Sequence, residues 1–400
     1  ELWFGGIDCL ADVWVNGKHA GSSADMLIER SFDVTDLIEQ GGSNTVQVII
    51  RPVVLGAQDH LLGSFSMGNF ATEESVYIRK APHMYGWDIM PRLVSAGLWR
   101  GVELRTLNPA RFTDVNWVTT HVDTASRNVS LFVDFQTRLP FDQYDKAKVR
   151  FTLTRDGKEA YRGEQVLFAH AGRIVVNLEK ADLWWPRGYG EPALYEAKGE
   201  LIGADGQVLD TDVKRIGLRI VQLDLSDIHL PDERGKFCFI VNGEKIFVRG
   251  TNWVPLDALH SRDAAQYESA MKLVTDANCN MVRCWGGNVY EDTRFFDLCD
   301  ENGILVWQDF AMGCSFYPQR ADFLDQLREE VTSVVLKLRN HPSLALWAGN
   351  NEDDANLFWS RLQPFHLDPN RDQVSRHVIP EVLYEFDPTR PYLPSSPYYS

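Results

Sequence analysis

The hydrophobic period of this chain changes near residue 237, and this change constrains the fold more than any other feature. Before it, apolar residues recur at every second position in short runs such as residues 149–155. After it, short apolar runs alternate with stretches of helical spacing such as residues 263–277. The first pattern is typical of half-buried β-strands, and regular strand–helix alternation is typical of a parallel sheet. The sequence therefore predicts β-sandwiches followed by a β/α domain.

Two or three domains are expected from the length, because 400 residues exceed one ordinary core, and the pattern along the chain divides it into three. Residues 1–108 are interpreted as a jelly-roll, sugar-binding-like β-sandwich with a long loop at 55–75. Residues 109–222 are interpreted as an immunoglobulin-like β-sandwich, and residues 230–400 as the N-terminal half of a (β/α)8 TIM barrel. The strands expected in the barrel cover residues 245–249, 280–286, 304–310, 344–347 and 391–396.

The expected barrel stops after about strand five, whereas a closed barrel of this type needs eight units. The first residues of the chain also read as the middle of a strand. From the sequence we therefore expect a piece of a longer protein, cut at both ends. A doubly wound sheet is the alternative for the β/α part, but no glycine-rich phosphate loop follows any of the expected strands.

Composition narrows the classes of partner. The net charge of -16 argues against nucleic acid or an anionic membrane, since phosphate binding needs a basic face. The 6 cysteines form no CxxC pair, and the 10 histidines form no HExxH pattern. We therefore expect no metal and no cofactor, and we interpret most cysteines as reduced core thiols. No apolar run is long enough to span a membrane. Cellular compartment and oligomeric state are left open.

Residues 344–352 form the most informative motif. An apolar run ends abruptly in Asn350, Asn351 and Glu352. This is how a buried parallel strand looks when its carboxyl end opens into an active site. An apolar wall disfavours the charged form of a neighbouring carboxyl group, so such a group can act as a general acid in sugar chemistry. Taken alone, the three polar residues also fit an ordinary turn between a strand and a helix.

Polar groups or tryptophans follow four consecutive expected strands, where barrel enzymes place their chemistry. A guanidinium, an acid, amides and indoles without metal-ligand spacing suit a carbohydrate pocket. The candidate residues are Asn252, Trp253, Arg283, Trp285, Asp309, Asn350, Asn351 and Glu352. Alternatively, Trp253 and Trp285 belong to the barrel core, and Arg283 with Asp309 forms a buried structural pair. His341 precedes its strand, at the wrong end of the barrel for chemistry, and is interpreted as structural.

At this point the chain resembles glycoside hydrolase family 2, and the resemblance runs through nearly its whole length. The matching segments are Gly97-Leu-Trp-Arg100, Leu183-Trp-Trp-Pro-Arg-Gly-Tyr-Gly190, Ile216-Gly-Leu-Arg219, Val241-Asn-Gly243, Arg249-Gly-Thr-Asn-Trp-Val-Pro255, Arg283-Cys-Trp-Gly-Gly287, Trp307-Gln-Asp-Phe310 and Asn340-His-Pro-Ser343. Two further segments, Trp347-Ala-Gly-Asn-Asn-Glu352 and Tyr85-Gly-Trp-Asp88, resemble the β-mannosidase branch of the family.

The resemblance implies a retaining exo-β-mannosidase that removes terminal β-mannose from oligosaccharides or glycoprotein glycans. It implies that Glu352 is the acid/base, that Asn351 bonds the 2-hydroxyl of the sugar, and that Trp285 walls the terminal-sugar subsite. Asp88, beside Trp87, is expected to reach the barrel mouth from the first domain and bind sugar hydroxyls.

Two departures from the family pattern matter. Asp88 is followed by Ile89-Met-Pro91 where the family commonly has Trp-Gly-Pro, so the outer subsite is expected to differ. No residue corresponds to the family's nucleophilic glutamate, so this chain alone is expected to be inactive. It is also expected to be poorly soluble, because an open half-barrel exposes apolar strand edges. The alternatives are another exo-β-glycosidase of the family (β-glucosaminidase, β-galactosidase or β-glucuronidase) and a non-catalytic carbohydrate-binding protein.

Overall fold

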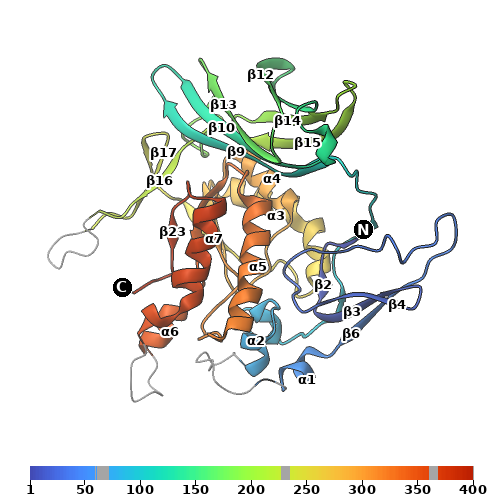
Figure 1. Cartoon of the computed structure of the whole chain (residues 1–400). Coiled ribbons are helices and arrows are strands. Elements are labelled where there is room, and N and C mark those ends of the chain that lie inside the picture. Colours follow the sequence, from blue (N-terminus) through green and yellow to red (C-terminus); the bar gives the residue numbers. More distant parts are fainter. Residues whose placement is uncertain (59, 61–71, 227–234, 360–367, 400) are drawn as a thin grey trace.

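The computed structural model describes residues 1–58, 60, 72–226, 235–359 and 368–399. Figure 1 shows two regions built from strands and a third in which helices cover a sheet. The predicted order of two β-sandwiches followed by a partial β/α barrel is confirmed. Within the described residues, no helix combines the length and the apolar character needed to cross a membrane.

The first domain is made of small antiparallel sheets around a core that includes Phe4, Ile7 and Val13. Two short helices lie within or beside the stretch predicted as a loop, of which residues 59 and 61–71 lie outside the described residues. Its elements are β1 (Leu2–Phe4), β2 (Ile7–Asp8), β3 (Leu10–Val15), β4 (Lys18–Ser23), β5 (Arg30–Phe32), β6 (Val46–Arg51), α1 (Val53–Ala57), α2 (Glu73–Tyr77), η1 (Pro82–Tyr85), β7 (Gly97–Leu98) and β8 (Val102–Leu104).

The second domain packs two antiparallel sheets, β13–β10–β9 and β12–β11–β14–β15, against each other. Alternation produces this core: the odd-numbered residues 129–135 of β10 are buried, and the even-numbered residues between them are only partly buried. The elements are β9 (Arg111–Asp123), β10 (Asn128–Arg138), η2 (Phe141–Gln143), β11 (Lys148–Arg155), β12 (Lys158–Val166), β13 (Ala171–Leu178), β14 (Tyr195–Ile202) and β15 (Val208–Ile216).

The third domain begins with a small antiparallel sheet and continues as a parallel sheet in the order β19–β20–β21–β22–β23. All five residues of β22 are buried, as expected for a strand covered on both faces. The elements are β16 (Val221–Asp224), β17 (Cys238–Val241), β18 (Glu244–Ile246), β19 (Gly250–Trp253), η3 (His260–Gln266), α3 (Tyr267–Asp276), β20 (Met281–Cys284), α4 (Thr293–Asn302), β21 (Leu305–Asp309), α5 (Ala321–Leu338), β22 (Leu344–Ala348), α6 (Asp353–Trp359), η4 (Pro369–Arg371), η5 (Val374–Val378), α7 (Ile379–Phe386) and β23 (Tyr392–Leu393).

One sequence-based assignment in this domain was wrong. The first barrel strand is β19, whereas the predicted strand at residues 245–249 falls on β18, which pairs with β17 in an antiparallel hairpin. Residues 374–386 are helical throughout, but they divide into a π-helical turn, η5, and α7. The reason is Pro380 at the start of α7, because proline has no N–H to donate to the preceding turn.

A buried ion pair and a contact between two histidines hold the first domain against the barrel domain. Arg79 and Glu330 form a pair at 2.6 Å, and both side chains are 0% exposed. His83 contacts His260 through their Nε2 atoms at 2.7 Å, and His260 Nδ1 contacts Asp263 at 2.6 Å. These contacts bracket the segment that leads into η1, so they fix the position of the loop that follows it.

Candidate active site

Four polar side chains meet at the carboxyl end of the parallel sheet, with Arg283 at their centre. Its Nη2 donates to Asp309 Oδ2 at 2.6 Å and to Asn351 Oδ1 at 2.8 Å, and its Nη1 donates to Asn252 Oδ1 at 3.3 Å. The four residues lie in or directly after β19, β20, β21 and β22. Parallel register explains the meeting, because it places Asn252 beside Arg283 and Arg283 beside Trp307.

Asp309 is the buried carboxylate of this network. It also accepts hydrogen bonds from the backbone N–H of Gly286 at 3.1 Å and from Nε1 of Trp307 at 3.0 Å. Burial raises the pKa of Asp309 to about 6, although the Arg283 guanidinium acts in the opposite direction. Arg283 and Asp309 therefore form the buried pair that the sequence analysis left open as an alternative. Arg283 of this pair also bonds Asn351.

Glu352 follows the network directly at the start of α6. Its φ of 61° lies in the left-handed region, and its N–H donates to the carbonyl of Ser396 at 3.3 Å. The side chain is exposed, so the described residues do not form the apolar wall expected beside it. Its two neighbours, Asn351 and Asp353, are both buried, so exposure is confined to Glu352 at this point of the chain.

Cys314 belongs to this site but escaped the sequence analysis. Its Sγ donates to Glu352 Oε2 at 3.4 Å and accepts from Asn351 Nδ2 at 3.4 Å. Burial and the nearby Glu352 raise the pKa of the thiol, so it stays protonated. Its position could have revealed it, because Cys314 lies in the loop after β21, at the end of the sheet where a barrel carries its active site. It was instead grouped with the core thiols.

Trp87 and Trp285 bring the first domain to the same end of the sheet. Their ring centroids are 5.2 Å apart at an interplanar angle of 68°, an edge-to-face contact. Trp87 also approaches Gly313, where a Cβ would lie 3.8 Å from the indole and 3.6 Å from the Asn351 carbonyl. Asp88, the next residue, is exposed. That Asp88 binds the sugar stays a prediction. That Trp285 walls the terminal-sugar subsite also stays a prediction, and its side chain is only 8% exposed.

The structure does not bring Trp253 and Asn350 to the open side of the site. Trp253 points outward from the sheet, where it packs on Phe295 at 4.6 Å and donates to the buried Glu291 at 2.8 Å. Side chains alternate along a strand, so Asn252 faces the network and Trp253 must face the helices. Asn350 is fully buried and accepts from the Ser395 hydroxyl at 2.5 Å, which makes it a support of the loop. A direct role of these two residues in substrate binding stays a prediction that their burial does not favour.

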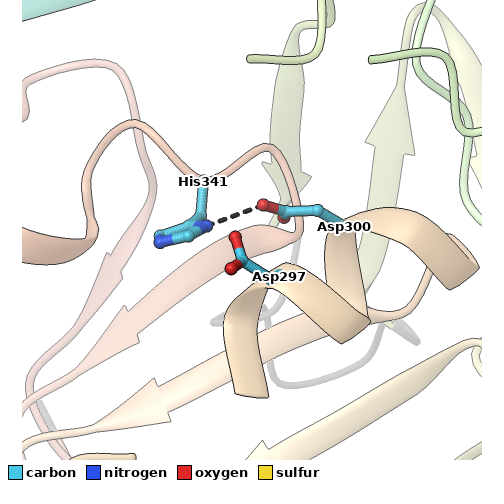
Figure 2. A group of neighbouring side chains, drawn as sticks. All are labelled: Asp297, Asp300 and His341. Carbon is cyan, nitrogen blue, oxygen red and sulfur yellow. Dashed lines mark hydrogen bonds and ion pairs between the residues drawn. The ribbon is translucent and has the colours of Figure 1, made fainter. Parts of the chain in front are cut away.

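Three side chains whose ligand atoms lie close enough to hold a metal ion are found at the other end of the sheet. Figure 2 shows Asp297 and Asp300 on α4 pointing toward His341. His341 Nδ1 contacts Asp300 at 2.6 Å, and Asp300 also accepts from the N–H of Ser343 at 2.9 Å. Asp297 is paired with Arg215 at 3.0 Å. Because the carboxylate oxygens already have partners, this group fits a structural role in joining α4 to the start of β22. The sequence analysis likewise interpreted His341 as structural.

The fold and this network define a class: a multidomain protein whose partial β/α barrel carries polar residues at the carboxyl ends of its strands, with a β-sandwich contributing a loop to that end. Comparison of the sequence with models of protein families identifies the family. Residues 1–100 match the glycosyl hydrolase 2 galactose-binding domain-like family, residues 110–219 match glycosyl hydrolases family 2, and residues 234–391 match the TIM barrel domain of that family. The chain belongs to glycoside hydrolase family 2.

Individual relatives agree with this membership. Beta-mannosidase B of Aspergillus clavatus is 34% identical over 99% of the chain and 48% of its own length. The crystal structure of a β-D-mannosidase from Dictyoglomus thermophilum superposes with a TM-score of 0.88 at 32% identity, over 99% of the chain and 48% of that protein. A β-glucuronidase from Bacteroides uniformis shares the fold, with a TM-score of 0.74 at 18% identity over 98% of the chain and 43% of that protein. The chain spans about half the length of the curated relatives it matches.

Proposed function

We propose that the protein is a retaining exo-β-mannosidase that releases terminal β-mannose from oligosaccharides or glycoprotein glycans, with Glu352 as its general acid/base. The observation that carries the proposal is the Arg283 network, which fixes Asn351 directly before the exposed carboxyl group of Glu352. The likeness to proteins named β-mannosidases supports the choice of sugar. An oligosaccharide is the only partner that the proposal requires, and no cofactor takes part.

In the proposed reaction, Glu352 protonates the leaving oxygen and then removes a proton from the attacking water. Asn351 donates to a hydroxyl of the bound sugar, and Arg283 prevents the amide from turning away. A retaining mechanism also needs a second carboxylate, about 5–5.5 Å from the first, as the nucleophile. Among the described residues we assign no nucleophile, because Asp309 is bound by Arg283 and Asp354 is paired with Arg376 at 2.6 Å.

The test is a panel of nitrophenyl glycosides, run on the full-length gene product. We expect β-mannoside to be hydrolysed fastest, and we expect Glu352→Gln to lower kcat/KM by about 10²–10⁴-fold. Glu385→Gln, an exposed glutamate on α7, is the matched control and should leave the rate unchanged. The loss in Glu352→Gln should be smaller for a dinitrophenyl glycoside, because that leaving group needs no protonation.

Each other outcome changes a defined part of the proposal. A faster rate on β-glucuronide, β-galactoside or β-glucosaminide would replace the sugar and keep the chemistry. Binding of mannosides without hydrolysis of any substrate would favour a carbohydrate-binding protein. Full activity of Glu352→Gln on the nitrophenyl substrate would remove Glu352 from the acid/base role.

A further inference from the structure

A second cavity, of about 570 Å³, lies between the second domain and the amino-terminal end of the barrel sheet. Its walls come from β9, β10 and β13 on one side and from the segments around α5, β22 and α7 on the other. Figure 1 shows that sheet lying across the ends of α5 and α7. Glu352 follows the opposite end of β22, so this cavity is separate from the candidate active site. Its volume is in the range of small-molecule sites.

A buried positive charge lies in the wall of this cavity. Arg219 is 8% exposed, and its Nε and Nη2 donate only to the carbonyl oxygens of Pro342 at 2.9 Å and Leu344 at 2.6 Å. Burial, and secondarily the nearby Arg390, lowers the pKa of Arg219 to about 9. Asp387 and Asp300 act in the opposite direction but do not offset the effect of burial.

The other deep guanidinium groups of the wall are neutralised. Arg339 is paired with Asp114, and Arg390 is paired with Asp387 at 2.7 Å. Arg219 has no such carboxylate partner in the described part of the chain. Asp387 and Asp300 lie close enough to favour its charged form, but neither contacts it, so its guanidinium can accept a further carboxylate or phosphate as a direct partner.

An unpartnered amide lies in the same wall. Asn116 lies on β9 between Val115 and Trp117, which both face the sandwich core, so its own side chain faces out of the sandwich. It lines the cavity and is only 9% exposed, yet within the described residues its amide makes no hydrogen bond. Its two N–H groups and its carbonyl oxygen are therefore free to bond a molecule held in the cavity.

We propose that this cavity binds a small molecule through an oxyanion group, a carboxylate or a phosphate, with Arg219 as its charge partner and Asn116 as a second donor. A guanidinium offers paired N–H donors that match the oxygens of either group. Because Asn116 belongs to the second domain while Arg219 is fixed to the barrel turn at Pro342, the bound anion ties the two domains together. Binding at this site should therefore raise the stability of the protein.

The experiment measures the melting temperature of the purified protein against rising phosphate, citrate or glucuronate, with sodium chloride keeping ionic strength constant. For at least one of the three we expect a saturable rise of about 2 °C. Arg219→Gln should abolish the rise, and Asn116→Ala should shift its midpoint to about tenfold higher concentration. Arg173→Gln is the matched control, because Arg173 lies at the exposed rim and is paired with Asp134.

The three anions distinguish the possible sources. A response to phosphate alone indicates a phosphate ligand, and a response to citrate or glucuronate alone indicates a carboxylate. The absence of any saturable rise would overturn the proposal, as would an equal rise in wild type and Asn116→Ala. The second variant decides the matter even where Arg219→Gln fails to fold, since Asn116 has no hydrogen bond to lose.

Discussion

Replacing Arg79 by methionine should loosen the first domain from the barrel. Arg79 donates from Nε and Nη2 to the two carboxylate oxygens of Glu330 at 2.6 and 2.8 Å, and the side chains of both residues are fully buried. Without Arg79, the remaining donor to Glu330 among the described side chains is the Tyr290 hydroxyl at 2.6 Å. Asp25 lies close by, and burial together with Glu330 raises its pKa.

The size of the effect follows from this geometry. Removing one partner of a buried ion pair leaves an uncompensated charge and typically costs about 3–5 kcal/mol, so Arg79→Met should lower the free energy of unfolding by that amount. The double variant Arg79→Met/Glu330→Leu removes both charges together. It should lie within about 1–2 kcal/mol of wild type, because apolar replacements of a whole buried pair are often nearly neutral.

Urea unfolding followed by tryptophan fluorescence measures these free energies, with the exposed pair Arg328–Glu381 as a control. Replacing Arg328 by methionine should change stability by less than about 1 kcal/mol, since its partner is half exposed. Two results would refute the reasoning. One is an Arg79→Met protein as stable as wild type, and the other is a double variant whose loss equals the sum of the two single losses.

Three further changes test other parts of the structure. Asn351→Ala should lower kcat of the full-length protein by about 10²-fold with little change in melting temperature, and unchanged kinetics would remove its role in the transition state. Cys314→Val should lower kcat/KM for a β-mannoside by about tenfold while Cys314→Ser, which keeps a donor to Glu352, should not; equal rates would make the thiol irrelevant. Burial lowers the pKa of His83 to about 3, so the folded protein excludes a proton that the unfolded chain binds below about pH 6.5. Stability should therefore fall by about 3 kcal/mol between pH 6.5 and 4, and the fall should be smaller in His83→Gln when both are unfolded by urea at each pH.

Sequence reasoning succeeded where the pattern was local. The alternating runs predicted the sandwich strands, and the run ending in Asn351 and Glu352 predicted β22 and the polar end of the sheet. The first barrel strand was missed because residues 245–249 are as strand-like as Gly250–Trp253. Only the hairpin between β17 and β18 shows which run joins the barrel.

The contacts that sequence reasoning missed join distant residues or depend on side-chain direction. Arg79 and Glu330 are 251 positions apart, and no periodicity relates them. The sequence left open whether Trp253 faces the substrate or the core, because one residue of register turns a side chain to the other face of a strand. Glu352 is exposed and has a left-handed backbone conformation, which the residue type glutamate does not predict.

The strand β22 is fixed at both ends. Before its first residue, His341 and Ser343 are bonded to Asp300 on α4, and after its last residue Asn351 is bonded to Arg283. The strand itself is only 5 residues long, about 16 Å, and it is completely buried. A substitution at His341 should therefore disturb the positions of Asn351 and Glu352 from the opposite end of the strand. In a screen for lost activity, such a variant would look like a catalytic mutant although its fault lies in the alignment of one strand.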